Sequence, residues 1–441
     1  MTLYYFKLAL ISIRKNLGHT ALMVAAIGLG VSVCMTIVTV NYLMGKDPIP
    51  YKSSQLYHVQ LDNWDPNRPY DDDRPEDAPE QLTWRDANAL MEANKAFRET
   101  KSSKFSVVVQ PDDPDIKPFQ VGGRGTHADF FTMFDTPFLY GGGWPNEADR
   151  DLNNSEQVAV LSRETNERVF GGENSVGRDI RLGEHIFRVV GVMDTWDPVP
   201  KFYDLNNNPF EGGEDIYIPF NLIMSKELNR GGNTNCWKPT EGGIDAFKAS
   251  ECVWVQYWVE LRSQQEYDDY LQFLNSYVET QKETGRFERP MNNYLRDVNE
   301  WLENNEVVMG EAKMLLAVAV MFLAVCLLNT IGLLLSKFMG KASEVGVRRA
   351  LGASRGTLFY QYLIETGLIG VSGGILGLLL TFLGLEAMKS IFGDQAENLM
   401  QLDMTLVMTA ILLAIVSSIA AGLYPTWRAC NISPAYQLKS Q

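Results

Sequence analysis

Residues 314–336, MLLAVAVMFLAVCLLNTIGLLLS, and residues 343–353, SEVGVRRALGA, decide the fold of this 441-residue chain. The first stretch is an apolar run with the ~20 residues that a helix needs to cross the hydrocarbon core of a bilayer. The second stretch follows closely and is basic and helix-prone. Because Lys and Arg are enriched in loops on the cytoplasmic side of a membrane, we predict a span that ends in a cytoplasmic loop.

Three further apolar runs, residues 21–44, 366–385 and 406–423, have similar lengths. The run 21–44 is too long for a signal peptide and no A-x-A site ends it, so we expect an uncleaved anchor. The sequence therefore predicts an α-helical membrane protein with four transmembrane helices, at 21–44, 314–336, 358–388 and 405–424. The segments between and around them are 1–20, 45–313, 337–357, 389–404 and 425–441.

Charge is distributed unevenly along the chain, whose formal net charge is -15. The polar block 45–313 holds 28 of the 39 Lys and Arg residues but 48 of the 54 Asp and Glu residues. Such an acidic surface argues against nucleic acid, which needs clustered positive charge. A solvated external domain explains the acidity, and attraction of a cationic ligand or partner is the alternative.

The loops predict the orientation in the membrane. Segments 1–20, 337–357 and 425–441 carry an excess of Lys and Arg, whereas residues 386–405 hold four acids against one Lys. The positive-inside rule places both termini and the 337–357 loop in the cytoplasm and the acidic block outside. Residues 3–17 have one apolar stripe, so this helix either lies along the inner membrane lipids or extends the first span.

The external block shows mixed patterns. Residues 56–61 and 252–262 alternate as strands do, and Thr83–Lys104 is predicted as a helix with Thr83 as its N-cap. From Glu266 to Met309 the pattern is mostly helical, and we expect its last part, from Met291, to lead as a stalk into the second span. The mixture favours a large α+β extracytoplasmic domain of two lobes.

Motifs for catalysis are missing from the sequence. It contains no G-x-x-x-x-G-K-[ST] phosphate loop and no H-E-x-x-H, and its four histidines are scattered. We therefore expect no catalytic residue, no cofactor and no metal site. Residues 370–374 match the hydrolase pattern G-x-S-x-G, but they lie within an apolar span and not after a strand.

Glycines in the third span have a simpler use. The pairs Gly370/Gly374 and Gly373/Gly377 are G-x-x-x-G motifs, which allow close helix packing. Whether they face a neighbouring span or a second subunit stays open. Glu365, at the cytoplasmic end of the same span, is expected to reach water or to pair with a basic residue of the 337–357 loop.

Two cysteines, Cys236 and Cys252, lie in the polar block. An oxidising compartment would allow a disulfide between them, and two free thiols are the alternative. The other three, Cys34, Cys326 and Cys430, lie in or beside spans and are interpreted as small apolar residues.

The layout of one span, a large external domain and three further spans resembles that of MacB/FtsX-type ABC transporter permeases. The stretches that carry the resemblance are QVAVLS (157–162), FRVVGV (187–192), EVGVRRALGA (344–353), QYLIE (361–365), GGILG (373–377) and YPTWRA (424–429). The loop is the most specific of them. It implies an ATPase-coupling segment made of Glu344, Val345, Gly346, Val347, Arg348, Arg349, Ala350, Leu351, Gly352 and Ala353.

The resemblance implies a bacterial inner-membrane protein with a MacB-like periplasmic core domain. The MacB exporter carries a fused ATPase and this sequence shows none, so a separate ATPase subunit is implied. A dimer with a second copy or a paralogous permease is also implied, and in some cases a periplasmic adaptor and an outer-membrane channel. Export of a periplasmic substrate by mechanotransmission is the expected function.

Two other functions remain open. A lipoprotein-release permease or an FtsX-like regulator of a cell-wall hydrolase would share the same coupling loop. A non-transporting membrane receptor is the alternative of another class, and the specific loop 343–353 argues against it.

Overall fold

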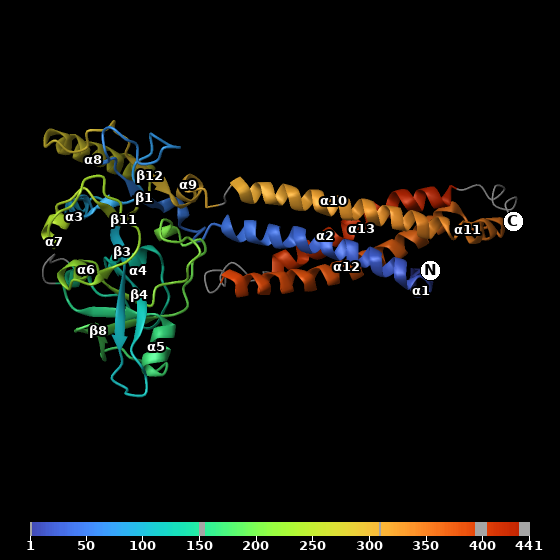
Figure 1. Cartoon of the computed structure of the whole chain (residues 1–441), viewed down its shortest axis with the longest axis horizontal. Coiled ribbons are helices and arrows are strands. Elements are labelled where there is room, and N and C mark those ends of the chain that lie inside the picture. The colour runs from blue at the N-terminus through green and yellow to red at the C-terminus, as the bar shows by residue number, and fades with distance from the viewer. Residues whose placement is uncertain (1, 150–154, 308–309, 393–403, 432–441) are drawn as a thin grey trace. The chain divides into compact units, whose positions relative to one another are not determined.

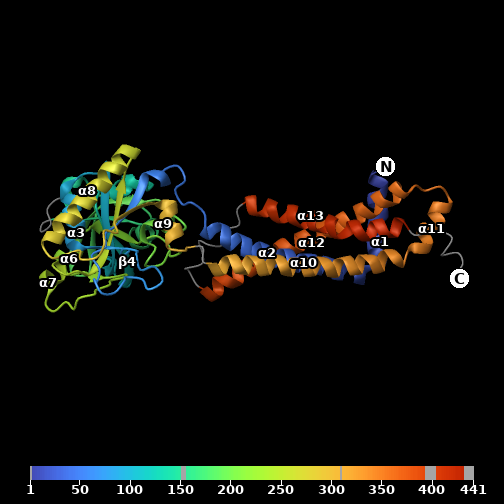
Figure 2. The same cartoon turned by 90° about the horizontal axis from the view of Figure 1, so that it is seen from above.

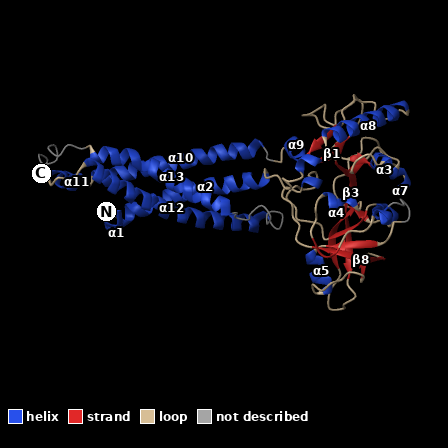
Figure 3. Cartoon of the chain, turned by 180° about the vertical axis from the view of Figure 1, so that it is seen from behind, coloured by secondary structure: helices blue, strands red, loops and turns tan. Residues whose placement is uncertain are grey.

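The structure is a computed structural model that describes residues 2–149, 155–307, 310–392 and 404–431 (Figure 1). The chain divides into two compact units. The membrane unit comprises Met1–Gly45 and Val308–Gln441, and the soluble unit comprises Lys46–Val307. All described strands belong to the soluble unit, and the described membrane unit is helical (Figure 3).

The membrane unit contains six helices within its described residues (Figure 2). They are α1 (Thr2–Lys15), α2 (Leu17–Met44), α10 (Gly310–Met339), α11 (Ala342–Ala350), α12 (Arg355–Phe392) and α13 (Met404–Cys430). Four of them include stretches long and apolar enough to cross a membrane: Leu17–Thr39, Met314–Met339, Arg355–Gly384 and Ile411–Cys430. Because α12 packs against α1, α2 and α13, it is the central element of this bundle.

The soluble unit is built on one mixed sheet. Its main path runs in the order β12-β1-β11-β3-β4-β9-β6-β8-β5, with β2, β7 and β10 paired at its sides. The pairs β4–β9 and β6–β8 are parallel, and the others are antiparallel. The strands are β1 (Leu56–Gln60), β2 (Leu82–Thr83), β3 (Arg98–Gln110), β4 (Phe119–Thr126), β5 (Phe138–Gly141), β6 (Val158–Leu161), β7 (Asp179–Leu182), β8 (His185–Met193), β9 (Ile216–Pro219), β10 (Asn229–Arg230), β11 (Val253–Glu260) and β12 (Tyr294–Asp297).

Helices of the soluble unit begin at polar caps that the sequence supplies. Thr83, Ser162 and Ser263 each accept a hydrogen bond from the backbone N–H three residues on, which satisfies a donor that the first turn leaves unpaired. The helices are α3 (Trp84–Ala93), α4 (Asp129–Met133), α5 (Arg163–Phe170), α6 (Asn221–Ser225), α7 (Ile244–Lys248), α8 (Gln264–Glu283) and α9 (Val298–Asn304). Short 3₁₀ turns occupy 53–55, 146–149 and 202–204.

Two secondary-structure predictions were wrong in part. The helix that starts after Thr83 ends at Ala93, and residues 98–104 belong to β3, because their backbone pairs with β11 and β4. No continuous stalk runs from Met291 to α10, since 294–297 form strand β12 beside β1 and α9 ends at Asn304. The strands predicted at 56–61 and 252–262 are confirmed as β1 and β11.

A fully buried ion network stiffens the middle of the sheet. Arg124 on β4 contacts both Asp204 and Glu214, and Lys201 reaches Glu214 at 2.8 Å. Burial alone would raise the pKa of Glu214, but the Arg124 and Lys201 cations outweigh it and hold that pKa well below its usual range. In this network, buried carboxylates are therefore matched by cations in direct contact.

Candidate functional site

The segment between the second and third spans folds as the short helix α11, whose last residue, Ala350, is followed two residues on by a glycine in the left-handed conformation. Gly352 has φ +100, its N–H donates to the Arg349 carbonyl, and the Ala353 N–H donates to the Arg348 carbonyl. This pattern closes a helix with a residue in the left-handed conformation, which glycine adopts without strain. Leu351 therefore lies on the last turn of a defined helix and not on a loose loop.

Apolar side chains of α11 face two ways. Val345 is 3% exposed and packs into the core of the membrane unit. By contrast, Val347 is 54% exposed and Leu351 is 84% exposed. These two residues lie four apart and share one face of the helix, so α11 presents a small apolar surface to its surroundings. We call Val347 and Leu351 the α11 knob.

Arginines next to the α11 knob hold the helix in place. Arg348 pairs with Glu344 at 2.5 Å and donates to the Gln361 side chain at 3.2 Å. Arg349 donates to the Cys430 carbonyl at the end of α13. Both guanidinium groups therefore have contacts within the chain. These contacts fix α11 against α12 and α13.

A buried polar cluster lies beside α11, and we call it the Glu365 hub. Glu365 on α12 pairs with Lys337 on α10 at 2.8 Å, and each side chain is 1% exposed. Ser12 on α1 donates to Glu365 at 2.5 Å, and Lys341 contacts both Ser12 and Glu365. Lys337 also donates to Thr20 on α2. Helices α1, α10 and α12 therefore meet at one carboxylate, and Lys337 links it to α2, at the point where the chain passes from α10 to α11.

Glycines of α12 allow close approach of two neighbours. A Cβ added at Gly370 would lie 2.3 Å from Ser418 on α13, and one at Gly374 would lie 2.8 Å from Ala414. Similarly, Cβ atoms at Gly373 and Gly377 would meet Ile27 at 2.7 Å and the Gly28 carbonyl at 3.1 Å on α2. The two G-x-x-x-G pairs thus face different helices of the same chain.

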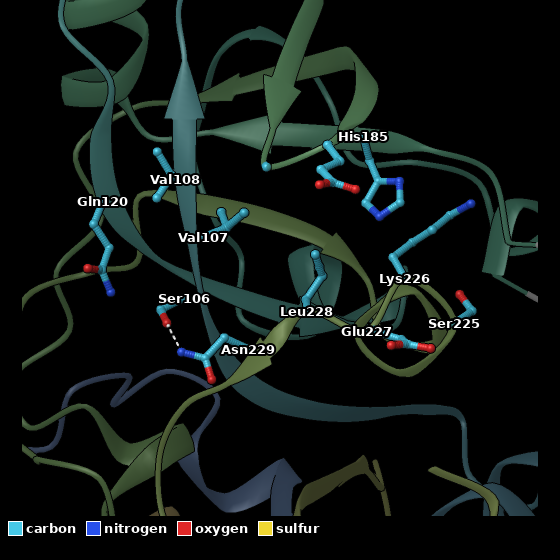
Figure 4. Close-up of a pocket in the computed structure, with 12 residues that line it drawn as sticks. Ser106, Val107, Val108, Gln120, His185, Ser225, Lys226, Glu227, Leu228 and Asn229 are labelled. Atoms are coloured by element: carbon cyan, nitrogen blue, oxygen red, sulfur yellow. Dashed lines mark hydrogen bonds between the residues drawn. The ribbon is translucent and has the colours of Figure 1, made fainter. Parts of the chain in front are cut away.

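The soluble unit has an open groove of about 730 Å³ beside β3 and the β7–β8 turn (Figure 4). Its polar residues include Gln120, His185 and Lys226, and their side chains point in different directions around the opening. A hydrogen bond of 3.0 Å joins Asn229 to Ser106.

Family models match most of the chain. The MacB-like periplasmic core domain matches residues 20–270, and the FtsX-like permease C-terminal region matches residues 316–434. The chain belongs to the MacB/FtsX-type permeases. The soluble unit is accordingly the periplasmic domain of a membrane permease. Its mixture of helices and strands confirms the predicted α+β class, whereas the division into two lobes stays a prediction.

Relatives of this permease are distant and longer. The macrolide export ATP-binding/permease protein MacB of Pasteurella multocida is 21% identical over 74% of this chain and 45% of its own length. The protein of the same name from Mannheimia succiniciproducens is 22% identical over 82% of this chain and 50% of its own length. The permease therefore spans about half the length of the curated relatives it matches.

Two solved structures that are similar to part of this permease are a periplasmic region and an extracellular domain. The periplasmic region of MacB from Actinobacillus actinomycetemcomitans is 15% identical with a TM-score of 0.37, covering 58% of this permease and 95% of that chain. The extracellular domain of the ABC-type transporter YknZ from Gram-positive bacteria is 14% identical with a TM-score of 0.32, covering 55% and 100%.

Sequence reasoning placed some contacts of this permease better than others. Glu365 does pair with residues of the 337–357 loop, Lys337 and Lys341, but it is buried and does not reach water. The participation of Ser12 was missed, because nothing in a sequence shows which helices touch. Cys236 and Cys252 lie together in the structure, with sulfurs 1.97 Å apart.

Proposed function

We propose that this chain is the permease subunit of an ABC transporter in a bacterial inner membrane. In this proposal both termini and α11 are cytoplasmic, and ATP is hydrolysed by a separate ATPase subunit. Family membership supports the permease role. The basic segments at 1–20, 337–357 and 425–441 support the orientation.

The α11 knob is the observation that carries the proposal. Val347 and Leu351 are exposed although they are apolar, whereas Val345 on the other face is buried. An apolar pair at a helix end fits a shallow groove of a partner. Burial of its apolar surface there would stabilise the complex by ~25 cal/mol for each Å² removed from water. Residues 344–353 thus form the ATPase-coupling segment, with Val345 as its internal anchor.

Movement of α11 would reach the rest of the membrane unit through the Glu365 hub. The hub joins α1, α2, α10 and α12 by contacts of side chains that are almost fully buried. Because helices keep their backbone hydrogen bonds internal, they can shift as rigid bodies when a neighbour is pushed. α2 and α10 continue in the chain into Lys46–Val307, so their displacement would drive motion of the periplasmic domain.

The finer function follows from this mechanism. Two permeases, either two copies or this chain with a paralogue, would work with two ATPase subunits and drive export of a substrate that is already periplasmic. A periplasmic adaptor and an outer-membrane channel would complete the path. Relatives named as macrolide export proteins support export over the other functions of such permeases.

Substitution of the α11 knob tests the proposal. We expect the double variant Val347→Asp/Leu351→Asp to lose co-purification with the ATPase, because each apolar side chain contributes about 1.5–3 kcal/mol when buried and a hundredfold weakening needs only about 2.7 kcal/mol. Membrane insertion should be unchanged, since both residues are exposed.

Ser343→Asp/Ser354→Asp is the matched control. It adds the same two charges at exposed positions of the same segment, and Asp can replace Ser354 as the cap that accepts from the Thr357 N–H. The control should retain the ATPase. Equal co-purification of both double variants would refute the role of the knob.

A further inference from the structure

A polar cavity of about 550 Å³ lies in the periplasmic domain, apart from α11 and from the groove of Figure 4. It is enclosed by α3, β3, the residues that follow β4, and the 3₁₀ turn at 146–149. Its ionisable lining consists of four carboxylates, one ammonium and one imidazole: Glu92, Glu99, Asp129, Asp149, Lys101 and His127. The lining is therefore acidic when its carboxyl groups are ionised.

Two of these carboxylates are buried with an oxygen that has no partner among the described residues. Glu99 is 2% exposed; its Oε2 accepts from the Tyr257 hydroxyl at 2.9 Å, and its Oε1 accepts no hydrogen bond. Asp149 is 3% exposed; its Oδ1 accepts from Asn221 at 3.3 Å, and its Oδ2 accepts none. Buried polar atoms are nearly always paired, and the further donors beside these two carboxyl groups are the uncharged hydroxyls of Tyr270 and Ser155, so a cationic donor is missing.

Lys101 does not supply that donor. Its ammonium donates to Asn88 at 2.5 Å and to Asn221 at 3.5 Å, and it makes no ion pair within 4.0 Å with the carboxylates that the structure describes. In the Arg124 network, by contrast, Glu214 has two cations within 2.8 Å. The periplasmic domain therefore neutralises the buried Glu214 by direct contact with cations, whereas Glu99 and Asp149 line a cavity without such a contact.

The chemistry of the cavity selects one class of ligand. Unpaired acceptors need donors, and carboxylates bind positively charged donors most strongly. The described residues include no group of three His, Cys, Asp or Glu side chains arranged to hold a metal ion. A volume of about 550 Å³ is large enough for an organic molecule, and Met91 adds an apolar surface to the wall.

We propose that this cavity binds an organic cation whose ammonium or guanidinium group pairs with Glu99 and Asp149. The strongly acidic periplasmic block, with 48 Asp and Glu residues against 28 Lys and Arg, would raise the local concentration of such a ligand. The site does not depend on the ATPase-coupling role of α11, so either proposal can fail alone.

Binding of a cation would be coupled to loss of protons. Burial raises the pKa of Glu99 to about 8 and that of Asp149 to about 7. Glu99 is faced by Tyr257 on β11, Tyr270 on α8, Lys101 on β3 and Asp129 on α4. Near pH 6 both acids would hold a proton and bind a cation weakly, so affinity should rise between pH 6 and pH 9.

Two neighbouring bases do not reverse this direction. Burial lowers the pKa of His127 to about 3, which leaves it neutral throughout the range. Burial lowers the pKa of Lys101 to about 8, although the charges of Asp149 and Glu99 raise it, so this ammonium competes with a bound cation for the carboxylates. Two carboxylates against one ammonium still leave the cavity more negative as the pH rises.

A pair of probes matched in shape but not in charge tests the proposal on the full chain in lipid nanodiscs. Butylguanidinium and butylurea have nearly the same shape, and only the first is charged. We expect calorimetric titration to show binding of butylguanidinium with an affinity that rises with pH, and at least about tenfold weaker binding of butylurea. Equal binding of the two probes, or no binding of either at millimolar concentration, would overturn the proposal.

Isosteric variants locate the site. Glu99→Gln and Asp149→Asn should each weaken butylguanidinium binding about tenfold and flatten its pH dependence. Glu184→Gln, in the groove of Figure 4, is the control and should bind as the unaltered chain does. If either cavity variant misfolds, the other variant and the probe comparison on the unaltered chain still decide the matter. Unchanged binding in a folded cavity variant would place the cation elsewhere and refute the assignment.

Discussion

The Glu365 hub gives the sharpest prediction about the membrane unit. Glu365→Gln would remove the charge that faces Lys337 at 2.8 Å, while both side chains are 1% exposed. Breaking a buried pair from one side costs about 3–5 kcal/mol, because the remaining charge stays buried without a counter-ion. The Thr20 hydroxyl, at 3.2 Å from Lys337, would compensate only a small part. We therefore expect Glu365→Gln to destabilise the bundle by about 3 kcal/mol.

Opening of the bundle can be followed by thiol labelling. Cys430 is 4% exposed in the membrane unit, so its labelling rate in detergent reports how often the packed helices separate. Glu365→Gln should raise that rate by about two orders of magnitude, because each 1.4 kcal/mol of lost free energy increases the open population about tenfold. Glu344→Gln is the control, since the Glu344–Arg348 pair is exposed and contributes about 0.5 kcal/mol or less.

A double variant separates the charge from the shape. Lys337→Met/Glu365→Gln removes both charges, so it should recover much of the stability that either single change loses, giving a coupling energy of about 2 kcal/mol or more. Two results would refute this reasoning. One is that Cys430 is labelled no faster in Glu365→Gln than in Glu344→Gln. The other is that the destabilisation of the double variant equals the sum of the effects of Lys337→Met and Glu365→Gln, which would show that the ion pair does not hold the bundle together.

Three further predictions concern other parts of the chain. Gly370→Ala should destabilise the bundle by about 1–3 kcal/mol because its Cβ would meet Ser418, whereas Gly367→Ala, with open space, should be neutral or slightly stabilising in the same labelling assay. Replacing Cys236 and Cys252 by Ser should cost about 3 kcal/mol in denaturant unfolding of the periplasmic domain, since a disulfide would close a short loop; an equally stable variant would show that no bond forms. Because burial raises the pKa of Glu99 from 4.5 to about 8, the folded state keeps a proton that the unfolded state releases, and stability should fall as pH rises from 4.5 to 8. Thermal unfolding of Glu99→Gln should show a flatter decline over that window, and parallel pH profiles would contradict the assignment.

Local signals in the sequence predicted much of the fold. The four apolar runs correspond to α2, α10, α12 and α13, because a span needs only length and hydrophobicity. The Thr83 cap was predicted, since a cap acts within one turn of the chain. The errors came where distant strands decide the local structure: residues 98–104 favour a helix alone but form strand β3 between β11 and β4.

The candidate sites show the same limit. The coupling segment 344–353 was found from its own residues, but the different exposure of Val345 and Val347 depends on how α11 packs. Glu99 and Asp149 were not predicted as site residues, because 49 residues and several elements separate them in the chain. Their meeting in one cavity requires the sheet to place β3 beside the 146–149 turn.

The pairing of β1 with β12 has a consequence for how such proteins diversify. These strands are the first and last of the soluble unit, and they lie side by side with Tyr57 opposite Asp297. In the membrane unit, the helices that lead to and from them, α2 and α10, also pack together. A domain whose two ends lie close together can be replaced as a whole, because the membrane unit has to accommodate only two neighbouring connections. Chimaeras that carry a relative's block in place of 46–307 should therefore insert and assemble, which would let the periplasmic domain change while the membrane unit stays constant.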